Sequence, residues 1–168
     1  MRAWAVTGLL LVSACTRSTA PWVDRLEVDA FEGGEVISLS KEQLEKQLVD
    51  GLAAAKFKIA RDGKKAPEGV KPWRVALAAG LSEPDLESKT SSLELVLELA
   101  HSGDSEPFVI DRRKRVPVVE GDVEAIQNGI RDALTATLDG AVKEAAVIIT
   151  LEDASAEVLK GKLEAGDD

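Results

Sequence analysis

The sequence predicts an α+β domain, with a mainly antiparallel sheet of about four to five strands and two helices packed on one face. Apolar and polar residues alternate in several short segments, which is the period of a half-buried strand. Two longer segments repeat apolar residues every three or four positions, as amphipathic helices do. Along the chain the segments run strand, helix, four strands, helix. Helices laid across the apolar face of the sheet would bury the apolar side of every element.

Alternation predicts where the strands lie. It is clearest at residues 93–100, where one face carries four leucines and the other is largely acidic, so the sheet should be covered on one side only. A tight turn at Gly33-Gly34 is expected to lead into a short return segment at 36–39. The main strands are expected at residues 25–30, 57–61, 73–79, 93–100 and 108–118.

Capping residues and apolar stripes predict the two helices. The first begins at a capping box of Ser40 and Gln43 and ends near Ala55. The second follows Asp122, a good N-cap residue. It contains Gly129 and Gly140, each of which weakens a helix by about 1 kcal/mol, so close packing on the sheet is expected to compensate. The stripes are Leu44, Leu48, Leu52 and Ala55 in the first helix, and Val123, Ile126, Ile130, Leu134, Leu138, Ala141, Ala145 and Ile148 in the second.

The α+β domain is expected to cover residues 25–149, followed by a C-terminal helical tail at 150–168. Together with residues 139–149, the tail is similar to one helical hairpin of the HEAT type, with an acidic residue near the turn and Glu157-Val158 opening a second helix. Such repeats need about three copies to be stable. A frayed C-terminal helix is therefore the main expectation, and the hairpin is the alternative.

Residues 1–14 have the layout of a secretory signal peptide. Arg2 supplies a basic start, an apolar stretch runs to Val12, and small residues follow. The apolar stretch is about half the roughly 20 residues that a membrane-spanning helix needs. The sequence therefore predicts export and not a transmembrane anchor.

The end of this segment, Val12-Ser13-Ala14-Cys15, resembles the lipobox of bacterial lipoproteins. The resemblance implies a diacylglyceryl thioether on Cys15, cleavage between Ala14 and Cys15, and acylation of the new amino terminus. Such acyl chains exceed the two signals that stable anchoring requires. Residues 15–24 would then be the lipidated cysteine and a tether. Thr16 in place of Asp favours the outer over the inner membrane, by the sorting rule of enteric bacteria; an ordinary signal peptide with a free cysteine is the alternative.

Charge excludes two classes of partner. The formal net charge is −9, and without Arg2 the processed chain has 20 basic and 30 acidic residues, or about −10. A nucleic-acid binder needs a net basic face, so no nucleic-acid partner is expected. Adhesion to anionic lipid by charge alone is excluded for the same reason. The single cysteine allows no intramolecular disulfide.

Residues for catalysis are scarce. The only histidine, His101, is expected in a solvated turn with Asp104 and Glu106 nearby, and one imidazole falls short of the ligand sets that hold zinc. The sequence contains no Gly-x-Ser-x-Gly elbow and no glycine-rich phosphate loop. We expect no enzyme activity, no metal, and no cofactor other than covalent lipid on Cys15.

The sharpest local anomaly is a run of cations in an acidic chain: Arg112, Arg113, Lys114 and Arg115. They are candidate contacts for an acidic partner protein or for lipid phosphate. The structural alternative places two cations on each face of a strand, where they pair with Glu94 and Glu98 or protect an exposed edge from aggregation.

Together these features predict a membrane-anchored periplasmic lipoprotein that acts as a protein-binding or assembly module of the cell envelope. The architecture looks like that of small envelope lipoproteins in transport and assembly complexes, without a shared motif. The alternative is a tethered carrier or sensor for a lipid or other small molecule, with a binding cleft between helices and sheet.

Overall fold

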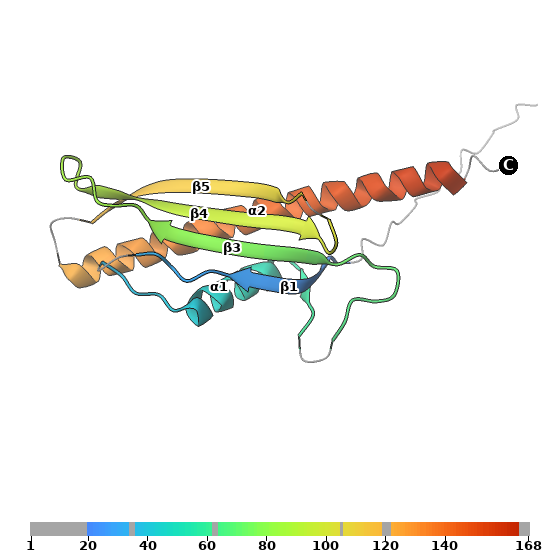
Figure 1. Cartoon of the computed structure of the whole chain (residues 1–168), viewed down its shortest axis with the longest axis horizontal. Coiled ribbons are helices and arrows are strands. Elements are labelled where there is room, and N and C mark those ends of the chain that lie inside the picture. The colour runs from blue at the N-terminus through green and yellow to red at the C-terminus, as the bar shows by residue number, and fades with distance from the viewer. Residues whose placement is uncertain (1–19, 34–35, 62–63, 105, 119–121, 165–168) are drawn as a thin grey trace, which may run out of the picture.

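The computed structural model describes residues 20–33, 36–61, 64–104, 106–118 and 122–164, with side chains described up to residue 156. It contains a five-stranded sheet with two helices on one face (Figure 1). The α+β class and the order of the elements are those predicted. The elements are β1 (Trp22–Val28), α1 (Lys41–Ala54), β2 (Lys58–Ile59), β3 (Trp73–Leu81), β4 (Thr90–His101), β5 (Phe108–Pro117) and α2 (Val123–Glu164).

The sheet is mixed, so the prediction of a mainly antiparallel sheet was wrong. Its strand order is β2-β1-β3-β4-β5. β1 runs parallel to both β2 and β3, whereas β3, β4 and β5 form antiparallel pairs. The physical reason is that α1 connects β1 to β2 as a crossover, which returns the chain to the sheet in its original direction.

The segment after β1 forms no return strand at residues 36–39. It continues beside β3 instead, where the Asp29 N–H donates to the Leu77 carbonyl (2.9 Å) and Glu32 forms a parallel bridge with Gly80. Ile37 and Leu39 are buried in the core and pair with no strand. Their alternation arises because each places an apolar side chain under the sheet while the intervening Ser38 is exposed.

The core lies between the helices and one face of the sheet. Leu93, Leu95, Leu97 and Leu99 of β4 are each 0% exposed, while the residues between them are partly exposed, apart from the buried Ala100 at the strand's end. The prediction that one face of this strand is covered and the other is open is therefore confirmed. The helices supply the facing layer, through residues that include Leu44, Leu48, Leu52, Ile130, Leu134, Leu138 and Ile149.

Helix α1 begins as predicted. The Gln43 N–H donates to the Ser40 hydroxyl (3.2 Å), and the Ser40 N–H donates to the Gln43 side-chain carbonyl (2.9 Å). Two backbone donors at the start of the helix are thereby satisfied, which confirms the capping box. Upstream, β1 begins at Trp22, three residues earlier than predicted, and Lys58 of β2 lies 5.6 Å from the centre of the Trp22 ring.

Helix α2 runs unbroken from Val123 to Glu164, so residues 139–164 do not form a HEAT-type hairpin. Val123, predicted in the buried stripe, is 67% exposed, and Ile149 in place of Ile148 is fully buried. A Cβ added at Gly129 or Gly140 would meet nothing within 4 Å, so the helix packs on the sheet through its apolar side chains and not through these glycines.

The far end of α2 projects beyond the sheet (Figure 1). Among the described residues, no helix combines the length and the apolar character needed to span a membrane.

Candidate functional site

The edge of the sheet formed by β5 is the strongest candidate site. β5 pairs with β4 over ten positions, from Thr90 opposite Pro117 to Leu99 opposite Phe108. On its other side, no segment within the described ranges pairs with it (Figure 1). A long strand with a free edge presents backbone donors and acceptors that another strand can use.

Hydrogen bonds nearby determine which backbone groups of β5 point outward. The Ser82 N–H donates to the Ser92 carbonyl (2.9 Å), so Ser92 turns its backbone groups toward β3. Ser92 stands opposite Arg115, and this pair is therefore the non-hydrogen-bonded kind. The bond from the Val118 N–H to the Lys89 carbonyl (3.2 Å) gives the same alternation. This alternation of hydrogen-bonded and non-hydrogen-bonded pairs places four residues with their N–H and C=O groups on the free edge: Val109, Asp111, Arg113 and Arg115.

Pro117 fits this assignment. It occupies the next outward position, where a missing N–H removes no bond from the β4–β5 ladder. A proline near the end of an otherwise regular strand is the signal in the sequence that marks β5 as an edge.

The four predicted cations lie along this edge and all are exposed. By register, Arg112 and Lys114 stand opposite Leu95 and Leu93, on the helix-covered face. Arg113 and Arg115 stand opposite Glu94 and Ser92, on the open face. The prediction of two cations on each face of a strand is therefore confirmed.

The four cations differ in whether they form ion pairs within the domain. Arg112 forms an ion pair with Glu144 of α2. Arg113 lies 3.8 Å from a Glu94 carboxylate oxygen and 3.6 Å from one of Asp111. Glu98 stands opposite Val109, so its predicted pairing with the cations was wrong. Lys114 and Arg115 form no ion pair within the described part of the chain.

Arg115 also faces the β3–β4 turn. There, the Ser88 hydroxyl and the N–H groups of Glu87 and Ser88 donate to Asp85 and hold the pKa of that carboxyl below its usual range. The positive charge of Arg115 adds a smaller effect in the same direction. The charge of Arg115 is therefore felt at the β3–β4 turn, although no ion pair joins it to Asp85 in the described structure.

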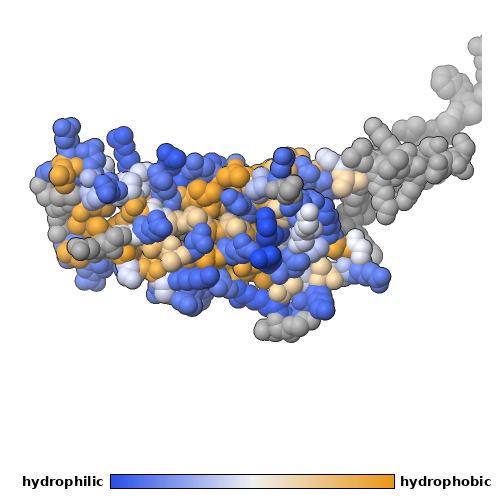
Figure 2. Space-filling model, in the orientation of Figure 1, coloured by the Kyte–Doolittle hydropathy of each residue, from blue (hydrophilic) through white to orange (hydrophobic). Residues whose placement is uncertain are grey.

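The open face beside β5 mixes apolar and charged residues. β3 and β4 contribute small or apolar residues there, together with Glu94 and Glu98 (Figure 2). At the other end of β5, Phe108 and Val109 are 40% and 56% exposed, which the sequence analysis did not single out. The free edge therefore has an apolar end and a cationic centre.

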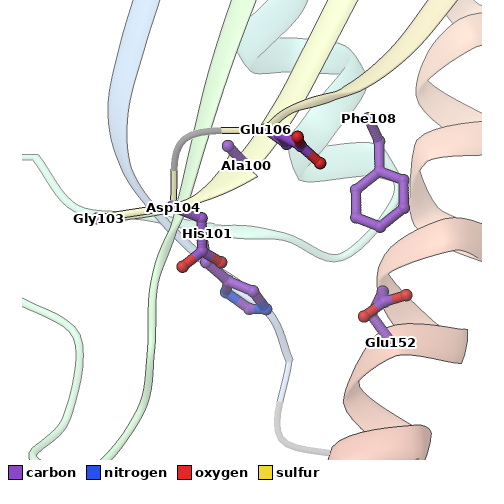
Figure 3. A pocket seen from close by; sticks show the side chains of 7 residues that line it. All are labelled: Ala100, His101, Gly103, Asp104, Glu106, Phe108 and Glu152. Carbon is purple, nitrogen blue, oxygen red and sulfur yellow. The ribbon is translucent and has the colours of Figure 1, made fainter.

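A hollow of about 440 Å³ lies between the β4–β5 loop and α2 (Figure 3). His101 ends β4 here and is half-buried, with its ring centre 3.8 Å from that of Trp73. The expectation of a solvated turn was wrong for this residue, because the indole covers one side of the ring. The hollow is lined by Ala100, His101, Gly103, Asp104, Glu106, Phe108 and Glu152.

The chemistry of this hollow is limited. The Lys71 ammonium donates to both oxygens of Asp104 (2.8 and 3.0 Å) and holds the pKa of that carboxyl below its usual range. Nδ1 of His101 is buried and makes no hydrogen bond in the described structure. No group of three metal-ligating side chains occurs among the described residues. Cys15 and Ala14, the predicted lipid attachment and cleavage positions, lie outside the described residues.

Comparison with known proteins gives information about the fold only. No family model and no curated protein matches the sequence. A solved protein of Xanthomonas campestris, described under the family model DUF330, is 15% identical, with 82% of this chain and 92% of that chain covered and a TM-score of 0.54. At this identity the likeness shows a shared fold alone.

Two further similar structures fit more loosely. A homolog of a neuraminyllactose-binding hemagglutinin from Helicobacter pylori is 18% identical over 82% of this chain and 90% of that chain, with a TM-score of 0.44. PelC from Paraburkholderia phytofirmans, solved as a dodecamer, is 11% identical over 73% and 90%, with a TM-score of 0.38. Neither fit supports an argument about function.

Proposed function

We propose that this chain is a lipid-tethered protein of the bacterial envelope, whose domain binds a protein partner in the periplasm through the edge of β5. The observation that carries the proposal is the free, cationic edge strand in a chain of net charge −9. In this proposal the protein acts by holding its binding domain at the membrane, without catalysis or a cofactor. The lipid on Cys15 holds the domain at the membrane, on the outer membrane in preference to the inner one, and the edge makes the contact.

The cations support binding more than they support stability. An exposed ion pair contributes about 0–1 kcal/mol to stability, so Arg112 and Arg113 stabilise the fold little. Lys114 and Arg115 lack even such pairs in the described structure. Like charges on adjacent positions of one strand repel each other, and an acidic partner would relieve that repulsion.

The first experiment tests the tether. We expect the processed protein to begin at Cys15 and to carry acyl mass, measured by mass spectrometry of the amino terminus after purification from membranes. In Cys15→Ser the protein should lose its acyl mass and leave the membrane fraction. A variant that stays equally membrane-bound, or a mature protein that begins elsewhere without acyl mass, would refute the tether.

The second experiment tests the edge. Replacing Arg112–Arg115 together by Ser should abolish the complex with the native partner, recovered by crosslinking in cells before membrane extraction. The matched control replaces four exposed lysines away from β5 by Ser and should leave that complex intact. The control positions are Lys41, Lys46, Lys64 and Lys65. Equal loss in both variants would show that charge alone, and not this edge, governs binding.

The alternative, a small-molecule carrier, rests on the hollow beside His101. Its lining combines an imidazole and a phenyl ring with three carboxylates, from Asp104, Glu106 and Glu152 (Figure 3). Lipid sites are predominantly apolar, so this lining fits a lipid poorly. Extraction of the purified chain with organic solvent should therefore release no stoichiometric apolar ligand other than the acyl groups; a stoichiometric ligand would favour the carrier.

A further inference from the structure

The free edge of β5 has a regular chemistry that specifies its partner. The outward N–H and C=O groups come from alternate residues, Val109, Asp111, Arg113 and Arg115, by the hydrogen-bond alternation of the antiparallel pair. These groups can form a new ladder only with an extended segment. A helix or a globular surface would leave most of them unpaired.

Side chains on both faces of the edge select for acidic residues. A strand added beside β5 would lie next to Arg113 and Arg115 on the open face and next to Arg112 and Lys114 on the helix-covered face. Opposite charges on neighbouring strands are stabilising and like charges are not. Four consecutive acidic residues would meet all four cations, because successive side chains of a strand alternate between the two faces.

The ends of the edge add further constraints. Phe108 and Val109 are exposed at one end, so the partner segment should carry apolar residues there. Pro117 at the other end offers no outward N–H, which limits the new ladder to about the length of the cationic run and the apolar end.

We propose, on the basis of the function proposed above, that the partner supplies an acidic extended segment that adds to β5 as a sixth strand of the sheet. Main-chain hydrogen bonds to the outward groups provide binding, and Arg112–Arg115 select acidic side chains. This is strand addition to an exposed sheet edge, with charge as the specificity element.

A second copy of the chain is the less suitable occupant. Pairing β5 with itself would bring two runs of four cations together, and only Asp111 in each strand would offset them. Like charges directly opposite each other destabilise a sheet. The edge therefore disfavours self-association and favours a different, acidic chain.

The test uses the full-length chain in detergent and a labelled synthetic octapeptide with four central glutamates, flanked on each side by one valine and one terminal threonine. Binding is followed by fluorescence anisotropy. The control peptide has the same sequence with alternate backbone nitrogens methylated, so that its charge is kept and its ladder is blocked. We expect at least about a tenfold weaker binding of the methylated peptide, the loss that 1.4 kcal/mol produces.

Two variants separate the ladder from the charge. Arg113→Gln removes one cation, whereas Arg113→Pro removes the same cation and an outward N–H that β4 does not use. The proline variant should fold, by circular dichroism, and should bind the octapeptide about tenfold or more weakly than Arg113→Gln. If Arg113→Pro does not fold, the methylated peptide still tests whether binding requires the backbone ladder.

The following outcomes would overturn strand addition or its acidic occupant. Equal binding of both peptides, or equal loss in the two variants, would overturn strand addition in favour of contact by charge alone. Absence of octapeptide binding would also overturn it, and the proposed function would still stand if the native complex depends on Arg112–Arg115. Self-association that Arg113→Pro removes, or tighter binding to phosphatidylglycerol vesicles than to the octapeptide, would overturn the acidic strand as occupant.

Discussion

At the scale of single residues, the pair of Lys71 and Asp104 is informative because it joins two loops far apart in sequence. Lys71 precedes β3 and Asp104 lies between β4 and β5, and the ammonium donates to both carboxylate oxygens. Both side chains are about half exposed. The pair therefore contributes to the arrangement of this end of the sheet more than to overall stability.

The pKa of Asp104 is lowered, first by the hydrogen bond from Lys71. A lowered pKa in the folded state means that the contribution to stability is present above the unfolded pKa of about 3.9 and is lost as pH falls through the folded value. In Lys71→Met, the Asp104 pKa should rise, measured by carbon NMR titration, and the loss of stability on acidification should become smaller. Lys65→Met, at another position of the loop between β2 and β3, is the control. An unchanged Asp104 pKa in Lys71→Met would contradict the assignment.

At the scale of elements, α2 shows how a long helix tolerates glycine. Gly129 and Gly140 lie on its exposed side, where a Cβ would meet nothing within 4 Å. Neither glycine makes a close contact that would compensate for its conformational freedom. Gly80 of β3 is different, because a Cβ there would lie 3.0 Å from the Glu32 carbonyl oxygen, where the connection after β1 passes beside the sheet.

Gly140→Ala should raise the free energy of unfolding by about 0.5–1 kcal/mol, since alanine fits the space and restricts the unfolded chain. Gly80→Ala, the same chemical change in β3, should lower it, because the Glu32 backbone must shift. Urea denaturation of both variants measures the two effects. Destabilisation by Gly140→Ala would show that this side of α2 has a contact that the structure lacks.

At the scale of the whole molecule, the acidic balance determines how the proposed tether must work. If the chain is processed as proposed, its charge of about −10 would be repelled by an anionic bilayer, so lipid would have to supply the attachment. The cations of β5 are a local exception on one edge of the sheet. Attachment and recognition would thus depend on different forces at different places.

This separation predicts a simple fractionation. Washing membranes with 1 M salt, where the screening length is about 3 Å, should leave the protein bound, while detergent should extract it. The affinity of the acidic peptide for β5 should instead fall steeply as the salt concentration is raised to 1 M. Release of the protein from membranes by salt alone would indicate attachment by charge and would contradict the lipid tether.

Local patterns in the sequence were sufficient for most elements. The alternation of Leu93 to Leu99, the capping box of Ser40 and Gln43 and the stripe of Leu44, Leu48 and Leu52 each depend on residues a few positions apart. Physical rules of period 2 and 3.6 act at that distance, so the segments were predicted close to their observed bounds. The cationic run was also evident, because it is contiguous in the chain.

Only the tertiary structure decided strand direction, strand order and the free edge. Residues 36–39 have the alternation of a strand but pass under the sheet, and β1 is parallel to both its neighbours. Whether Arg112–Arg115 face a neighbour or solvent depends on which strand lies beside β5. The reason is that periodicity specifies which side of a segment is buried, whereas pairing depends on the path of the whole chain, which brings distant segments together.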